Sequence, residues 1–389
     1  MVELVNLSKD WAKALTDKDS KRDHVAFFSI GSWSHKIALM VLPLAAAAGQ
    51  KVIYLSESIF SGKNCLRSYL NSNFKVKTEL SSSEIRRLLT KNKAAIFSIP
   101  KPISAFFEKQ INSFVKRKTP LSKISLNLLT KYFIVLALLS GAKRILVDLR
   151  IAPDSICSNQ AMARELALSW QRAAHNFNIS TCFLLINMIQ PLGNSLGCHL
   201  QAAEVIQSLK GNGPLDLLKL SLEIATELIF PGQKIAERME IKKLLKRKLA
   251  NQQALLKLKE IIEDQGGEIS YEDYLIPPSE TAPTRVLAEK TGYVQRFNLK
   301  KFLILRARLK DWNTKANSNS CYKDGIIINS KIGDKVGKDE SLAEIYFHKS
   351  FEASTWSDLI KNIFVLSPFP PPFQPFVIEK LKNNFRSTP

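Results

Sequence analysis

Lysine and arginine clusters are the chemistry-bearing residues that stand out in this sequence. The chain has 56 lysine and arginine residues against 35 aspartate and glutamate residues, which gives a formal net charge of +21. Three clusters carry part of this excess, and they lie near positions 116–118, 240–249 and 299–310. Cations in such clusters bind phosphate groups with an affinity that falls as salt rises. The residues concerned are Lys116, Lys118, Lys242, Lys243, Lys246, Arg247, Lys248, Lys300, Lys301, Arg306, Arg308 and Lys310.

Three interpretations of this charge stay open. RNA and an acidic protein are both suitable partners for a basic surface, and a solvated face that only keeps the protein soluble is the third interpretation. The segment 240–249 has the pattern of a basic amphipathic helix, whereas 299–310 alternates bases with apolar residues and is expected to be a strand region. The exposed aromatic residues that RNA-binding surfaces place among their cations are missing, since Phe302 and Trp312 are expected in the core.

Other catalytic and metal-binding patterns are missing from the sequence. The five histidines (His24, His35, His175, His199 and His348) do not have metal-ligand spacing, and His199 is expected to be a buried helix residue. Phosphate loops of the Walker type, dinucleotide fingerprints and the nucleophile-elbow motif are absent. We therefore expect no cofactor. Asp148 ends an apolar run, where α/β proteins place ligand residues, but a single acid is weak evidence.

Length and composition predict a globular protein that folds as two domains or as one domain with an appendage. The chain has 389 residues, of which 45% are hydrophobic. The amino-terminal residues mix acids with bases, so no signal peptide is expected. The longest apolar stretches, Ile37–Ala48 and Tyr132–Leu139, are too short to span a membrane. Five cysteines without a CxxC pair favour the cytoplasm or another reducing compartment.

Alternating strand and helix patterns predict an α/β fold with a central, largely parallel sheet. Strands are expected at Val25–Ser29, Lys51–Leu55, Ala94–Ile99, Arg144–Leu149 and Thr181–Asn187. Helices are expected between these runs. Such short, continuous apolar runs are typical of strands that are buried on both faces of a parallel sheet.

The second half of the chain changes character. Residues 201–265 have a helical pattern, and 277–283 has the composition of a linker. Short alternating runs that follow, such as Ile326–Ile328 and Leu342–Tyr346, predict a small β-rich domain. The end of the chain contains SPFPPPFQPF, which predicts an extended tail or an arm that lies on the surface.

A long signature in the middle of the chain resembles that of the pyrimidine-nucleoside and thymidine phosphorylases. The matching residues lie between Ile186 and Leu220, and they are Gln190-Pro-Leu-Gly193, Gly197, Leu200, Glu204, Leu209-Lys-Gly211, Gly213-Pro214 and Asp216-Leu217. A second set, which resembles the family's carboxyl-terminal β domain, comprises Gly292-Tyr-Val, Asp324-Gly325, Lys331–Leu342 and Ile345-Tyr346. The resemblance spans roughly Val25 to Tyr346.

The resemblance implies a domain organisation. Residues 1–24 form an amino-terminal extension, and 25–276 form a glycosyltransferase-like α/β domain with a reduced helical lobe at about 102–140. Residues 284–350 form the carboxyl-terminal β domain, and 351–389 form the Pro/Phe-rich tail. The family's amino-terminal helical segment, which helps to form its dimer, is largely missing before Val25. A homodimer is therefore possible but is not implied by the resemblance.

The resemblance also implies where phosphate would bind. The family's phosphate loop aligns with Phe27–His35, in which Ser29 and Gly31 are retained. Phe27 and Phe28 stand where the family has lysine and histidine. The second loop retains Ser56, although Glu57 would place a negative charge near the anion.

The base-binding positions of the family are mostly replaced. The alignment places them at Arg117, Tyr132 and Leu136, so only Arg117 is retained. Arg117 lies within a basic run, and a solvated cluster explains it equally well. The segment Arg150–Ile156 replaces another family loop.

These losses predict a diverged, catalytically silent homologue that acts as a binding or assembly module. The first alternative is an active phosphorylase that cleaves thymidine-like or uridine-like nucleosides with phosphate. In that case Ser29, Gly31 and Ser56 would bind phosphate and Arg117 the base. The second alternative is a basic RNA-binding protein. Because the phosphate loop has lost its lysine, the excess positive charge is expected to lie away from the inferred cleft.

Overall fold

The structure is a computed structural model of the whole chain. It describes residues 2–15, 23–31, 34–56, 66–116, 123–153, 155–230, 232, 234–274, 283–315, 324–347 and 353–383.

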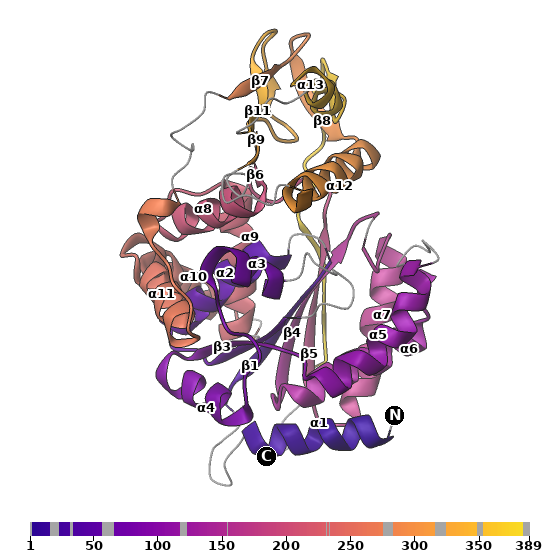
Figure 1. Cartoon of the computed structure of the whole chain (residues 1–389), viewed down its shortest axis with the longest axis vertical. Helices are drawn as coiled ribbons and strands as arrows, with labels where there is room; N and C mark the ends of the chain where they lie inside the picture. Colours follow the sequence, from indigo (N-terminus) through magenta and orange to yellow (C-terminus); the bar gives the residue numbers. More distant parts are fainter. Residues whose placement is uncertain are drawn as a thin grey trace.

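A six-stranded sheet forms the centre of the molecule, with strand order β13-β5-β4-β1-β2-β3 (Figure 1). Five strands run parallel: β1 (Val25–Ile30), β2 (Val52–Ser56), β3 (Ala94–Ser98), β4 (Arg144–Ile151) and β5 (Ser180–Asn187). All six residues of β1 are buried, as expected of an apolar run covered on both faces. The predicted α/β class with a largely parallel sheet is confirmed.

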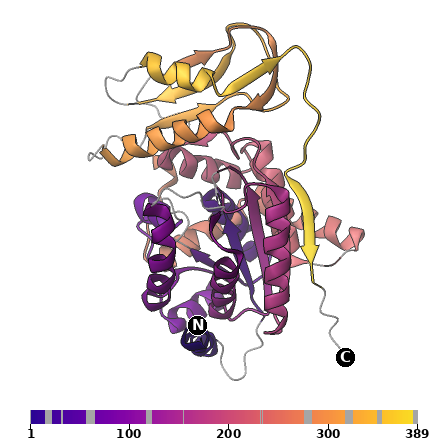
Figure 2. The ribbon, with the colours of Figure 1, turned by 90° about the vertical axis from the view of Figure 1, so that its right-hand side faces the viewer.

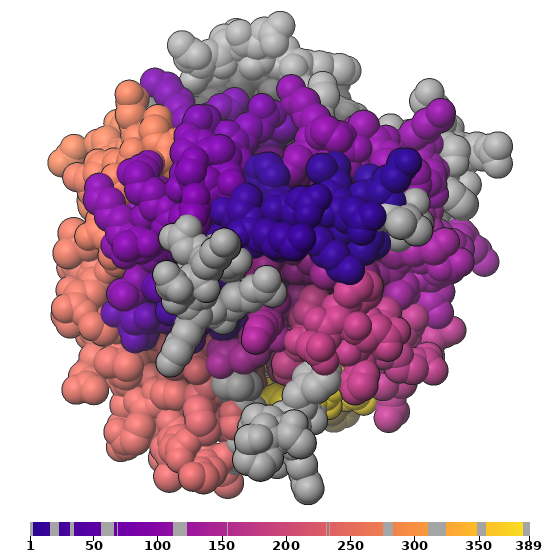
Figure 3. Space-filling view, turned by 90° about the horizontal axis from the view of Figure 1, so that it is seen from below, coloured from indigo at the N-terminus to yellow at the C-terminus, as the bar shows by residue number. Residues whose placement is uncertain are grey.

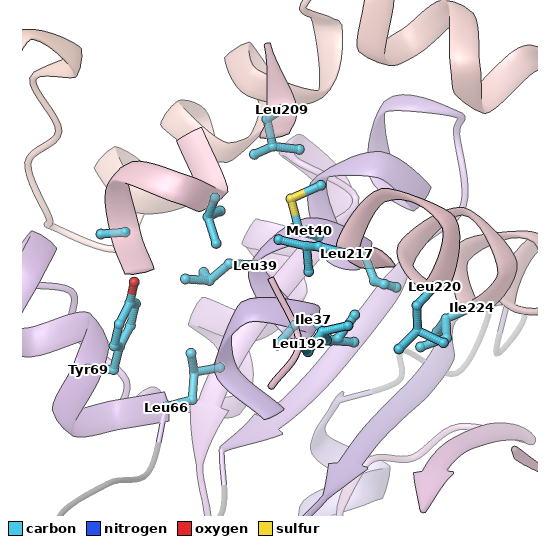
Figure 4. Close-up of a cluster of buried hydrophobic side chains, with 14 of the residues drawn as sticks. Ile37, Leu39, Met40, Leu66, Tyr69, Leu192, Leu209, Leu217, Leu220 and Ile224 are labelled. Atoms are coloured by element: carbon cyan, nitrogen blue, oxygen red, sulfur yellow. The ribbon is translucent and has the colours of Figure 1, made fainter. Parts of the chain in front are cut away.

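Helices cover both faces of this sheet. One face packs against α2 (Ser34–Ala47), α3 (Leu66–Phe74), α8 (Cys198–Leu209), α9 (Leu215–Ile229), α10 (Ile235–Ala250) and α11 (Gln253–Asp264). Figure 4 shows part of this core, in which Ile37, Leu39 and Met40 of α2 lie among side chains of the neighbouring helices. A 3-10 turn at Tyr271–Asp273 follows α11. Residues 36–46 of α2 are all buried, as expected of a helix whose residues after Lys36 are all apolar.

The other face packs against a second set of helices. They are α1 (Val2–Leu15), α4 (Ser82–Lys91), α5 (Lys101–Lys116), α6 (Leu126–Leu139) and α7 (Gln160–His175). Helix α1 contacts α4 and α6, and Figure 3 shows it lying across the lower face of the molecule. None of the described helices is long and apolar enough to cross a membrane.

A region of antiparallel strands lies at the other end of the molecule, above the carboxyl ends of the parallel strands (Figures 1 and 2). One sheet has the order β6-β9-β11-β7, and the other has the order β10-β8-β12. The strands are β6 (Ser195–Leu196), β7 (Thr284–Leu287), β8 (Gly292–Phe297), β9 (Gly325–Ile328), β10 (Lys335–Val336), β11 (Ser341–Tyr346) and β12 (Phe364–Ser367). Strand β6 lies between β5 and α8 of the α/β part, so its pairing with β9 joins the two parts.

The segment expected to be a strand region at 299–310 is instead helix α12 (Leu299–Lys315), so that prediction is wrong. Its buried apolar residues are Phe302, Leu305 and Leu309. Their spacing of three and four residues follows the period of a helix, whereas a strand would bury every second residue. The local alternation of bases and apolar residues was therefore misleading.

The residues after 350 contain three further elements. Helix α13 (Ala353–Lys361) contacts α12 and β7, and β12 pairs with β8. The last strand, β13 (Val377–Lys382), pairs antiparallel with β5 at the edge of the central sheet. Ion pairs of Lys380 and Lys382 with acidic residues of α9 hold this strand in place.

Candidate functional site

Ser29 and Asp148 form the centre of the candidate site. They lie side by side on the neighbouring parallel strands β1 and β4, near the carboxyl ends of both. The Ser29 hydroxyl donates a hydrogen bond of 2.6 Å to Asp148 Oδ2. Both side chains are almost fully buried. The Ser29 hydroxyl, which the resemblance assigns to phosphate binding, is therefore hydrogen-bonded to the carboxylate of Asp148 in the same protein.

Arg150 completes this group from two positions further along β4. Its Nη2 donates to Asp148 Oδ2 at 2.7 Å, and its Nε donates to the same carboxylate at 3.0 and 3.1 Å. Arg150 and Asp148 are both 0% exposed. A buried carboxylate needs such a partner, because an isolated charge would be costly to remove from water.

Gly31 follows β1, and its lack of a side chain is required by this group. Its φ is +115°, and a Cβ at this position would lie 2.9 Å from Arg150 Cβ and 3.0 Å from Ser155 Oγ. The Ser155 hydroxyl donates to the Arg150 backbone oxygen at 2.8 Å. The glycine is therefore explained by close packing against β4 and the segment after it.

His35 lies in the first turn of α2, beside the same strand end. Its Nε2 lies 2.9 Å from Gln201 Oε1, and its ring stacks on Tyr69 with centroids 4.6 Å apart. The pKa of His35 is lowered to about 3, chiefly by burial and also by the positive charges of Lys36 and Arg150, although the Gln201 hydrogen bond acts in the opposite direction. His35 is therefore a neutral group near pH 7, and it does not supply the positive charge that a phosphate needs.

Lys36, the next residue of α2, is also turned inward. Its Nζ donates to the backbone oxygens of Leu192 and Ser195 at 3.0 and 2.8 Å, and to Glu204 Oε2 at 2.5 Å. The side chain is 0% exposed. The other carboxylate oxygen of Glu204 accepts hydrogen bonds from the backbone N–H groups of Asn194 and Ser195. This ion pair stabilises the turn that follows β5.

The family-like signature around Gln190 forms the joint between the α/β part and the β region. Gln190 Oε1 accepts a hydrogen bond from the Ile332 N–H at 2.9 Å, and Lys331 Nζ donates to the Pro191 backbone oxygen at 2.6 Å. Lys331 also pairs with Asp216 in the first turn of α9, with Nζ and Oδ2 3.2 Å apart. Burial lowers the pKa of Lys331. These contacts explain the family-like signature as a structural joint that packs the α/β part against the β region.

The two replaced base-binding positions lie inside the helical layer. Tyr132 and Leu136 of α6 are 0% and 2% exposed. The Tyr132 ring packs edge-on against Phe107 of α5, with centroids 4.9 Å apart. Both side chains therefore belong to the core. Arg117 and Lys118 lie outside the described residues, as do the side chains of Ser56 and Lys116.

The predicted basic residues of α10 are partly neutralised. Lys242 pairs with Glu223 at 2.5 Å, and Lys243 pairs with Glu240 at 2.8 Å. Lys248 donates to Gln253 Oε1 at 2.5 Å. Lys246 and Arg247 are exposed on the same helix.

The basic helix α12 lies over the carboxyl ends of the parallel strands, as Figures 1 and 2 show. Arg306 is half-buried there, and its positive charge contributes to the lowered pKa of His35. This position corrects the expectation that the excess charge lies away from the inferred cleft. Lys300, Lys301 and Arg308 lie on the same helix, where Lys301 donates to Asn362 Oδ1 at 3.0 Å. The Lys310 side chain is outside the described residues.

A separate hollow of about 340 Å³ opens beside the carboxyl end of β3. Its lining includes Ser98 of β3, Arg67 of α3, and Lys101 and Glu108 of α5. Arg67 is paired with Glu79 at 2.6 Å. The lining does not include Ser29, Gly31 or Asp148. Among the described residues there is no group of histidine, cysteine and acidic side chains that could hold a metal ion.

Comparison with known proteins gives consistent matches over most of the chain. The chain is 24% identical to a pyrimidine-nucleoside phosphorylase of Staphylococcus haemolyticus over 336 residues, which cover 86% of this chain and 76% of the relative. It is 24% identical to that of Bacillus subtilis over 322 residues (82% and 74%), and 25% identical to that of Staphylococcus aureus over 334 residues (85% and 76%). These matches support a distant relationship to the pyrimidine-nucleoside phosphorylases.

No family model matches the chain. Among solved structures, it is similar to the anthranilate phosphoribosyltransferase of Thermus thermophilus, with 12% identity and a TM-score of 0.48. That match covers 68% of this chain and 84% of the other.

Sequence reasoning assigned Ser29 and Gly31 to one site, and the structure places them together. It missed Arg150 and Lys36 as the partners of buried carboxylates. One signal was available, because Asp148 and Arg150 interrupt an apolar run of β4 with two opposite charges on one face. No signal in the sequence pairs Lys36 with Glu204, which lies 168 positions away.

Proposed function

We propose that this distant relative of the pyrimidine-nucleoside phosphorylases does not perform phosphorolysis and acts as a binding or assembly module. The observation that carries the proposal is the closed group of Ser29, Asp148 and Arg150. The hydroxyl aligned with the family's phosphate loop is 3% exposed and donates to a carboxylate. A phosphate ion would have to displace this hydrogen bond and approach the negative charge of Asp148.

The neighbouring positions support the same proposal. Phe27 and Phe28, which stand where the family has lysine and histidine, are 0% and 2% exposed and pack into opposite faces of the sheet. Lys36 is the first cation after the loop, and its charge is balanced by Glu204. On the base side, Tyr132 and Leu136 are core residues. Catalysis of phosphorolysis needs preorganised charge at the anion, and these replacements remove it.

The experiment is a phosphorolysis assay of the full chain with thymidine and with uridine in the presence of inorganic phosphate. We expect no release of free base, while the Bacillus subtilis relative under the same conditions serves as the positive control. Calorimetric titration with inorganic phosphate should likewise show no binding. Phosphate-dependent release of base that disappears in Ser29→Ala would contradict the proposal. Ser221→Ala, which changes a fully buried serine on α9, controls for general loss of stability.

A polyanion such as RNA is the partner that we propose for the binding module. The exposed Lys246 and Arg247 on α10 support it, as does the net charge of the chain. Because Lys242 and Lys243 are paired with acids, we expect only modest affinity. Single-stranded RNA should bind with an affinity that falls steeply between 50 and 200 mM salt, as is typical of phosphate contacts. Binding that is unchanged in Lys246→Ala/Arg247→Ala, or no binding at low salt, would contradict this partner.

A further inference from the structure

The segment 367–376 connects β12 to β13, and we call it the strap. Five of its eight residues from 368 to 375 are proline. Each proline has a fixed φ near −65°, and each residue before a proline is restricted to extended conformations. Prolines at 368, 370, 371, 372 and 375 therefore restrict almost every residue of the strap. This composition favours a polyproline II helix, which exists without internal hydrogen bonds.

Both ends of the strap are held by sheets. Ser367 pairs with Tyr293 of β8, so one end belongs to the β region. At the other end, the Phe376 backbone oxygen accepts a hydrogen bond of 2.8 Å from the Asn187 N–H, and Val377 then pairs with Ile186 of β5. Figure 2 shows this yellow part of the chain running from the β region down to β13 along the side of the molecule. The strap is therefore ordered from both ends and lies on the surface.

Two phenylalanine rings of the strap are directed into solvent. Phe369 is 74% exposed and Phe373 is 91% exposed, whereas Phe376 packs partly against the core. Isolated exposed apolar residues are common on protein surfaces, but here two large aromatic rings lie exposed within five residues of each other. With three residues per turn, Phe369, Pro372 and Pro375 lie along one edge of a polyproline II helix.

From these features we infer that the strap is a preformed ligand for a partner protein with an aromatic-lined groove. Grooves of this kind bind polyproline II segments with a proline at every third position, as at 372 and 375. The strap is already ordered, so it loses little conformational entropy on binding. Exposed aromatic rings supply contact area at low entropic cost, and such residues dominate the energetics of protein interfaces.

The composition of the strap also defines the chemistry of its partner. Residues 367–376 contain only serine, proline, phenylalanine and glutamine, so no charged side chain takes part. Five of these residues have no N–H group, which leaves backbone oxygens as the main polar groups. The complementary groove therefore has aromatic walls and hydrogen-bond donors. The net positive charge of the chain does not contribute to this recognition.

The test uses the full chain and three isolated domains that bind polyproline segments, one each of the SH3, WW and EVH1 classes. Calorimetric titration should show binding to at least one of them. The double variant Phe369→Ala/Phe373→Ala should lose at least tenfold in affinity with an unchanged thermal unfolding curve, since both rings are exposed. Pro371→Ala/Pro372→Ala should weaken binding as well, because it loosens the strap while keeping both rings.

Ile235→Ala is the matched control, because this residue is an exposed apolar side chain (76%) that lies on α10 and is not part of the strap. It should bind like the unchanged chain. Absence of binding to all three domain classes would overturn the inference, and so would equal binding by the double phenylalanine variant. A dimer that is seen in sedimentation equilibrium and disappears in the same double variant would also overturn it. In that case the strap would bind a second copy of this chain and not a different partner protein. None of these results depends on the phosphorolysis assay, because the strap shares no residue with the Ser29 group.

Discussion

The hydroxyl of Ser29 lies 2.6 Å from Asp148 Oδ2, although the two residues are 119 positions apart in the chain. Their contact follows from the parallel register of β1 and β4, in which Ser29 is directly paired with Asp148. Side chains at paired positions lie on the same face of a sheet. Ser29, which the family resemblance assigns to phosphate binding, therefore uses its hydroxyl in a hydrogen bond inside the protein.

Replacing Ser29 by alanine should lower the free energy of unfolding by about 1.5–3 kcal/mol, the range for hydrogen bonds to charged groups. The reason is that Asp148 loses a donor while it stays buried. Urea denaturation measures the change. Ser155→Ala is the control, because it removes a hydrogen bond to a neutral backbone oxygen and should cost only about 0.5–1.5 kcal/mol. Equal costs for the two variants would argue against a charged acceptor for Ser29.

Gly193 provides a test of the joint between the two parts of the molecule. Its φ is +67°, and a Cβ there would lie 2.2 Å from Glu204 Oε2 and 3.1 Å from Lys36 Nζ. Gly193→Ala should therefore break the Lys36–Glu204 pair as well as strain the backbone, at a total cost of about 3 kcal/mol or more. Gly211→Ala is the control, since Gly211 also has a positive φ (+93°) but open space around it. Backbone strain alone should cost about 1–2 kcal/mol there. Thermal unfolding that ranks the two variants equally would contradict this close packing.

Lys36→Met should destabilise the protein by about 3–5 kcal/mol, because it leaves the buried Glu204 carboxylate without its cation. The double variant Lys36→Met/Glu204→Gln should recover part of this loss. An amide at position 204 can still accept from the backbone N–H groups of Asn194 and Ser195, and it carries no charge to bury. Urea denaturation of both variants measures the difference. A double variant that is less stable than Lys36→Met would show that the pair is not the main source of the loss.

The sequence was sufficient to predict the five parallel strands, because each is a short apolar run that the sheet buries on both faces. It was insufficient for α12. The apolar residues at 302, 305 and 309 follow the period of a helix, but the bases between them also suggest the two-residue alternation of a strand. Strand β13 was also missed. Its residues are only partly buried, and its place at the edge of the sheet depends on ion pairs with Glu223 and Glu227 of α9. Such partners lie more than 150 positions away and leave no local signal.

The candidate site shows the same limit. Ser29 and Gly31 could be selected from the sequence through their place in the family alignment. Their actual neighbours, Asp148 and Arg150, could not be assigned to them, because the order of strands in the sheet brings them together. The family alignment therefore predicted the position of the site, whereas only the structure identified the contacts that occupy it.

Strand β13 should loosen in acid, whereas it should stay paired with β5 at neutral pH. Burial alone would raise the pKa of Glu223, but hydrogen bonds and positive charge from Lys242 and Lys380 outweigh it and lower the pKa to about 2. A carboxyl whose pKa is lower in the folded state stabilises the fold above about pH 4.5, and this contribution is lost as the pH falls toward 2. Because solvent screens this partly exposed carboxylate, the contribution to stability is well below about 3 kcal/mol. Hydrogen exchange of the β13 amide groups, measured between pH 5 and pH 3, should report the loosening.

Glu223→Gln should flatten this pH dependence, because an amide does not titrate. Glu240→Gln is the control, since Glu240 forms an exposed pair with Lys243 and such pairs contribute little. A pH dependence that stays the same in Glu223→Gln would assign the effect to another group.

His35 should remain uncharged from pH 8 down to at least pH 5. Its pKa is lowered to about 3, chiefly by burial and in part by the charge of Arg306 on α12. Since the pKa in the folded state lies below the ordinary value, neutral His35 favours folding fully above about pH 6.5, and this contribution declines toward pH 3. Nitrogen-15 spectra of the imidazole groups measure the charge state directly. Arg306→Gln should raise the pKa of His35 by removing a nearby positive charge, whereas Arg308→Gln, an exposed position on the same helix, should leave it unchanged. Titration of His35 near pH 6.5 in the unaltered chain would contradict the burial of this ring beneath α12.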